Sequence, residues 1–88
     1  MTKEQMNVIT GLIGGLELAI VHLANLQAKS MGITAEAMAA SFESTAEATP
    51  ESVQNHKLIQ AVLNQIAAGV RGTGAGQEFD ALMNRLLH

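Results

Sequence analysis

The chain has 88 residues, with five basic and eight acidic side chains that give a formal net charge of -3. Hydrophobic residues (48%) and the eight glycines together make up about 57% of the sequence, compared with roughly 45 to 50% in an average soluble domain. Fourteen of the hydrophobic residues are alanines, which add little when buried. A domain this small also buries a limited share of its surface when it folds alone. We expect a single domain, residues 1–88, with more apolar surface than it can cover.

The composition excludes several classes of chemistry. Without cysteine the chain can form no disulfide, thiolate nucleophile, cysteine-type zinc site or iron–sulfur site. The basic residues stand too far apart to form the stripe that neutralises several phosphates, and two phenylalanines provide no stacking platform for bases. The basic residues are Lys3, Lys29, Lys57, Arg71 and Arg85. Direct nucleic-acid binding is therefore not expected.

The amino-terminal residues bear on localisation. Residues 1–7 contain one lysine and one glutamate before an apolar run. They lack the positive excess and the small-residue cleavage site of a secretory signal. We expect a cytoplasmic protein.

The first predicted element is a long helix from about Lys3 to Ala28. Its apolar residues recur three and four apart, which is the spacing of one helical face. These residues are Ile9, Leu12, Leu16, Ala19, Leu23 and Leu26. The alternative is a β-hairpin within residues 8–23 that turns at Gly14-Gly15. A helix is favoured because the three-four spacing continues through Leu26.

Small residues on this helix predict close packing. Gly11, Gly15 and Ala19 are four apart, in the pattern that lets two helix backbones approach each other. Each interior glycine costs roughly 0.5 to 1 kcal/mol relative to alanine, so packing within or between chains should offset the cost. The alternative is a bend at Gly14-Gly15 without an interface. We predict a homodimer whose self-association residues are Leu12, Gly15, Leu16, Ala19 and Leu23.

A second, shorter helix should follow. Lys29 and Gly32 are typical of a helix end, and Thr34 is a good N-cap for the next helix. Only Met38 and Phe42 are large apolar residues on it. We therefore expect a peripheral helix of about three turns.

The third predicted helix starts at Thr49-Pro50-Glu51, because proline suits the first helical position, and runs to about Val70. We expect it to be the antiparallel partner of the first helix. A flexible glycine-rich loop, residues 71–76, should lead to a short amphipathic helix at Gln77 to Leu87. The predicted architecture is all-α: a small bundle of four helices, with two long antiparallel helices and two shorter covering ones.

Three carboxylates on the second helix form a candidate partner site. Glu36, Glu43 and Glu47 are seven and four residues apart and share one helical face. They predict a site for a basic partner protein. The alternative is a solvated face that only maintains solubility.

No spacing indicates catalysis. His22, His56 and His88 do not pair locally with a second ligand on one helix face. The glycine-rich loop has no preceding strand and no Gly-Lys-Ser/Thr sequence, so it does not match a phosphate-binding loop. We expect no catalytic residue, no metal and no cofactor.

These patterns favour a small non-enzymatic interaction protein, an adaptor, inhibitor or assembly factor, that acts as a homodimer. The alternative is a membrane-inserting or pore-forming protein that uses residues 8–26, which are nearly long and apolar enough to span a bilayer. Glu17, His22 and Asn25 oppose that alternative, because polar residues inside a membrane are costly.

Overall fold

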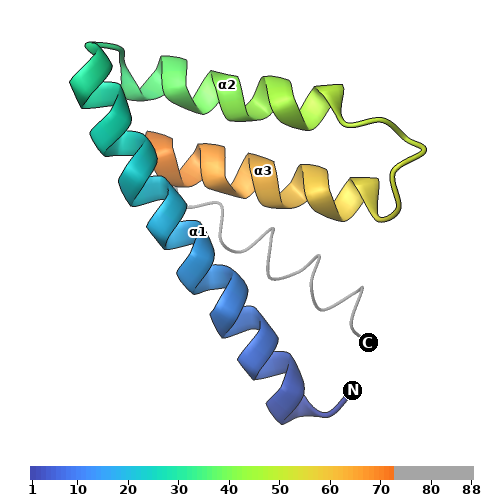
Figure 1. Cartoon of the computed structure of the whole chain (residues 1–88). Coiled ribbons are helices and arrows are strands. Elements are labelled where there is room, and N and C mark those ends of the chain that lie inside the picture. The colour runs from blue at the N-terminus through green and yellow to red at the C-terminus, as the bar shows by residue number, and fades with distance from the viewer. Residues whose placement is uncertain (73–88) are drawn as a thin grey trace.

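The computed structural model describes residues 1–72, which form three α-helices and no strand (Figure 1). They are α1 (Lys3–Met31), α2 (Ala35–Ala48) and α3 (His56–Arg71). The all-α prediction is confirmed, and the β-hairpin alternative for residues 8–23 is wrong. The predicted four-helix count is not matched by these three helices. The expected fourth helix, Gln77 to Leu87, lies outside the described residues.

Both ends of α1 are set by local hydrogen bonds. Thr2 caps the amino terminus: its side chain accepts from the backbone N–H of Gln5, while the Gln5 side chain accepts from the backbone N–H of Thr2. At the other end, Gly32 takes a positive φ of 71° and its N–H donates to the carbonyls of Ala28 and Lys29. Between these caps α1 is continuous through Gly14 and Gly15, which do not interrupt it.

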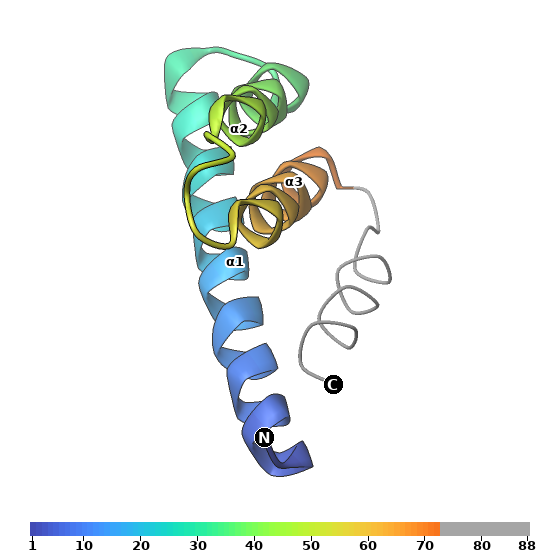
Figure 2. The same ribbon diagram turned by 90° about the vertical axis from the view of Figure 1, so that its right-hand side faces the viewer.

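The predicted pairing of the long helices is wrong. The antiparallel partner of α3 is α2, and α3 packs more extensively on α2 than on α1. α1 crosses one end of this pair obliquely (Figure 1), and a view nearly along α2 and α3 shows α1 running past both (Figure 2). The physical reason is that Ala39 and Ala46 of α2 are almost completely buried, and alanines let helix backbones come close. The alanine-rich face of α2, from which we predicted a peripheral helix, is therefore the main surface on which α3 packs.

The start of α3 also differs from the prediction. Thr49 does not cap α3 but ends α2: its hydroxyl donates to the carbonyl of Thr45, 3.1 Å away. Its backbone is extended (φ -66°, ψ 118°), as expected for a residue that precedes proline. Residues 50–55 then form a turn, and α3 begins only at His56, after Asn55 in the left-handed conformation (φ 62°).

The core of the described part is small and rich in alanine. Buried residues from all three helices meet in it, and partly buried Val21, Met38, Phe42 and Val62 pack around them. The buried members are Ala24, Ala39, Ile66, Ala67 and Val70. No large side chain of residues 1–72 is fully buried. Because alanine removes little apolar area from water, this core stabilises the fold less than leucines would.

One glycine permits the crossing of α1 and α3. A Cβ atom added at Gly69 would lie 2.8 Å from a methyl carbon of Val21. The valine side chain is branched and stiff, so it cannot turn away easily. The absence of a side chain at Gly69 therefore allows α1 to approach α3 this closely.

We predict that Gly69→Ala destabilises the protein although alanine is the better helix former. The clash with Val21 should lower the free energy of unfolding by about 1 to 3 kcal/mol. The matched control is Gly11→Ala, since a Cβ there would meet nothing within 4 Å; it should stabilise by up to about 1 kcal/mol. Urea denaturation at one fixed protein concentration measures both. Equal stability changes would contradict the close contact.

Candidate interaction surfaces

α1 places small or polar side chains toward its neighbours and leucines toward solvent. Its buried residues are Glu17, Ala24 and Ala28. In contrast, Leu12 and Leu16 expose 63% and 65% of their surface. The helix therefore packs on α3 through its less apolar side, and its large apolar side is left uncovered by α2 and α3.

The uncovered side forms a continuous stripe, which we name the leucine face. Its members are spaced by four, three, four and three residues, which is the spacing of a seam between two packed helices. They are Leu12, Leu16, Ala19, Leu23 and Leu26, all of which are exposed. Four of the five predicted self-association residues belong to this face, and the fifth, the exposed Gly15, lies at its edge. The structure thus brings the predicted set onto one accessible surface.

The row of small residues on α1 is not used for packing within residues 1–72. Cβ atoms added at Gly11 and Gly15 would meet nothing within 4 Å, and Ala19 is exposed. The close approach that does occur uses Gly69 instead. The four-residue spacing of the row made Gly11, Gly15 and Ala19 conspicuous, whereas the isolated glycine in α3 had no comparable sequence signal.

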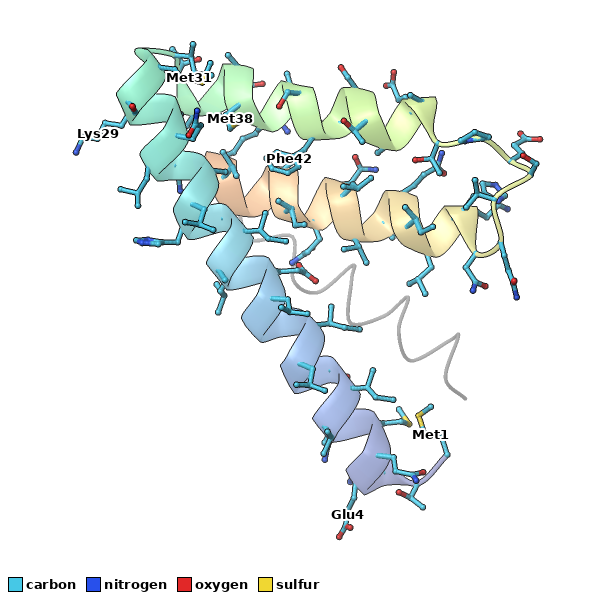
Figure 3. The ribbon with its side chains drawn as sticks, viewed as in Figure 1. Met1, Glu4, Lys29, Met31, Met38 and Phe42 are labelled. Atoms are coloured by element: carbon cyan, nitrogen blue, oxygen red, sulfur yellow. The ribbon has the colours of Figure 1, made fainter. Side chains whose placement is uncertain are left out.

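A shallow apolar groove adjoins the leucine face where α1 meets α2. Leu23 belongs to both surfaces, and Met38 and Phe42 line the groove from α2 on the side facing the other helices (Figure 3). Ile20, Ala24 and Gln27 complete its lining. The leucine face therefore broadens into a two-helix surface near its carboxyl end.

α1 also meets the criteria of length and composition for a membrane-spanning helix. It has 29 residues, and only 6% of its most apolar 18-residue window is buried. A core helix of a globular protein would be mostly covered. An uncovered apolar helix of this length is found both in proteins that bind a partner through it and in proteins that insert it into a bilayer.

Two of the three carboxylates predicted to bind a partner already have a cation within the chain. The guanidinium of Arg71, at the end of α3, forms paired hydrogen bonds with Glu36 and with Glu43 on α2. Its Nε and Nη2 lie 2.7 Å from the two Glu36 oxygens. Nη1 and Nη2 lie 2.7 and 2.6 Å from those of Glu43. This ion-pair cluster holds the end of α3 against α2.

The cluster has a clear electrostatic effect. Hydrogen bonds from Arg71, supported by its positive charge, hold the pKa of Glu36 and of Glu43 below the ordinary value of 4.5, against the opposing effect of desolvation. The same bonds raise the pKa of the Arg71 guanidinium. Glu47 is exposed and makes no ion pair with any residue of the described part. The acidic face is thus partly neutralised, and binding of a basic partner there stays a prediction.

Arg71 is a residue that the sequence reasoning overlooked. It lies 35 and 28 positions from the carboxylates that it contacts, so no local spacing relates them. The sequence has no basic residue between Lys29 and Lys57, so no nearby residue indicated a cation for these carboxylates. Only the antiparallel packing of α2 and α3 brings a cation to them.

The histidines do not form a site in residues 1–72. His22 is exposed on α1 and His56 begins α3, and His88 lies outside the described residues. Over the described range, no three histidine or acidic side chains come close enough to hold a metal ion. The histidines of the described part therefore add no metal-binding geometry to the apolar and acidic surfaces.

Comparison with known proteins gives no match: no family model, no curated protein and no solved structure is significantly similar to this chain.

We predict that the ion-pair cluster makes stability depend on acid pH. Because the pKa values of Glu36 and Glu43 are lower in the folded state, their contribution is present above about pH 4.5 and is lost as the pH falls through the folded values. Arg71→Gln should lower the stability of the fold at pH 7 and should reduce the loss of stability between pH 5 and pH 3. Thermal melts at several pH values in this range give the change of stability with pH.

Lys57→Gln is the matched control, since it removes one positive charge from the same helix at an exposed position without an ion pair in residues 1–72. It should retain the wild-type slope. An unchanged slope in Arg71→Gln would show that the cluster does not contribute in solution.

Proposed function

We propose that this chain is a small non-enzymatic interaction protein that acts as a cytoplasmic homodimer, an adaptor, inhibitor or assembly factor that catalyses no reaction. The observation behind the proposal is the orientation of α1, which buries Ala24 and Ala28 and exposes Leu12, Leu16 and Leu23. A contiguous apolar stripe of this kind marks a contact surface. A second copy of α1 has the matching spacing.

The energy available from the leucine face is of the right order for a reversible dimer. Eight leucines, four from each copy, are more than half exposed in the single chain. Covering them would contribute on the order of 1 to 2 kcal/mol each. Their total is comparable with the roughly 4 to 15 kcal/mol lost in translational and rotational freedom. We therefore expect a dimer whose population depends on protein concentration.

Leu16→Glu tests the dimer directly. A carboxylate in the centre of the leucine face would be buried without a partner on association, so the variant should be a monomer where the wild-type chain is a dimer. Sedimentation equilibrium at several concentrations gives the mass of each.

Leu18→Glu is the control. Leu18 is also an exposed leucine of α1, with 72% of its surface accessible, but two residues further along a helix it points away from the leucine face. This variant should keep the wild-type mass. A monomeric wild-type chain, or a dimer unaffected by Leu16→Glu, would refute the proposed interface.

We also propose that a basic partner protein binds the acidic face of α2. The acidic face of α2 retains Glu47 without an ion pair in the described part, and two carboxylates share the single charge of Arg71. With three carboxylates and one guanidinium, the face keeps an excess of negative charge. Such a surface favours a basic protein partner by electrostatic attraction, and the leucine face stays separate for dimerisation.

Membrane insertion through residues 8–26 is the second candidate, and the exposure of α1 supports it. The packing of α1 favours the dimer over this alternative. In a bilayer, α1 would have to give up contacts of Val21 and Ala24 with α3 or take buried Glu17 into hydrocarbon, where a charged side chain is costly.

Vesicle flotation distinguishes the two functions. We expect the chain to stay in the dense fraction with vesicles of pure phosphatidylcholine and with equimolar phosphatidylcholine and phosphatidylglycerol. If the wild-type chain floats while Leu16→Glu does not, the leucine face binds lipid and the membrane function replaces the dimer.

A further inference from the structure

We infer that the two copies of α1 pair antiparallel, with their midpoint between Glu17 and Leu18. This inference rests on the proposed homodimer and adds the arrangement of its two chains. In this register Leu16 lies opposite Ala19 of the second copy, and Leu12 lies opposite Leu23. A large side chain thus meets a small one at the centre, as close helix packing requires.

The charges at the ends of α1 support the antiparallel arrangement. Glu4 stands in the first turn and Lys29 in the last, at opposite ends of the helix (Figure 3). Their spacing puts both on the same flank of the leucine face. Antiparallel pairing brings Glu4 of one copy near Lys29 of the other, at both ends of the dimer. In a parallel pair the same groups stay a helix length apart, and the helix dipoles are aligned unfavourably.

The shape of the chain supports the same arrangement. The amino-terminal part of α1 extends beyond α2 and α3 (Figures 1 and 2). The carboxyl-terminal part lies beside α2, where Met38 and Phe42 widen the apolar surface. Antiparallel pairing lays the projecting part of each copy against the wide part of the other, so that Leu12 reaches the groove next to Leu23. Parallel pairing would place the two projecting parts against each other and leave both grooves uncovered.

Single cysteines test the orientation, because the chain has none of its own. Leu12→Cys and Leu23→Cys are prepared separately, one of them labelled with ¹⁵N, then mixed and oxidised. The two positions are eleven residues apart, so like cysteines in the antiparallel pair lie about 16 Å apart along the axis. A disulfide needs Cα atoms within about 7 Å. In the mixture we expect disulfide-linked dimers that contain one labelled and one unlabelled chain. Either variant oxidised alone should give almost no disulfide-linked dimer.

The other outcomes separate the orientation from the dimer itself. Disulfides between like cysteines, with none between unlike ones, would show a parallel pair and overturn this inference while the dimer stands. A wild-type chain that sediments as a monomer would overturn the proposed function as well. A dimer in which no combination cross-links would place the interface elsewhere and overturn both.

Leu18→Cys is the matched control for chance encounters. Leu18 is close to the proposed midpoint but points away from the leucine face. The Leu18→Cys variant should therefore form no more disulfide than Leu12→Cys or Leu23→Cys oxidised alone. Sedimentation of the reduced Leu12→Cys and Leu23→Cys proteins checks that each still forms the wild-type dimer.

Discussion

The close approach of α1 to α3 sets which side of α1 faces the other helices and which side faces solvent. It requires Gly69 beneath Val21 and is continued by Ala24 of α1 and Ala67 of α3 in the core. Once these small residues face inward, helix geometry directs the leucines of α1 outward. The apolar surface that could have formed a core becomes the outer surface, and the candidate function follows from that orientation.

Because the leucines of α1 face outward, few interactions stabilise the single chain. Its core in the described part is mostly alanine, and part of what holds α3 to α2 is the Arg71 ion-pair cluster, which is partly exposed. Exposed ion pairs contribute little to stability. In the proposed dimer the leucine face would add burial that the single chain lacks, so folding and association would be linked through protein concentration.

Two surfaces with different chemistry lie on different helices. The leucine face belongs to α1, whereas the carboxylates belong to α2, where Arg71 neutralises them in part. A molecule of this kind can associate with itself through one surface and keep the other for a second partner. In the proposed antiparallel dimer the two copies of the α2 and α3 pair would lie toward opposite ends, so that one dimer could present two acidic faces.

Local sequence patterns were sufficient to predict the helical class and those helix ends that depend on neighbours a few residues away. Gly32 ends α1 and Thr34 starts α2 as predicted, because each cap bonds within its own helix. The start of α3 was mispredicted since the Thr49 side chain can bond in either direction. The folded arrangement was needed to show which helices pair, which side of α1 faces inward and that Arg71 reaches Glu36 and Glu43. All three features depend on contacts between residues that are distant in the sequence. A periodic pattern shows that a helix has an apolar side, but it does not show which surface covers that side.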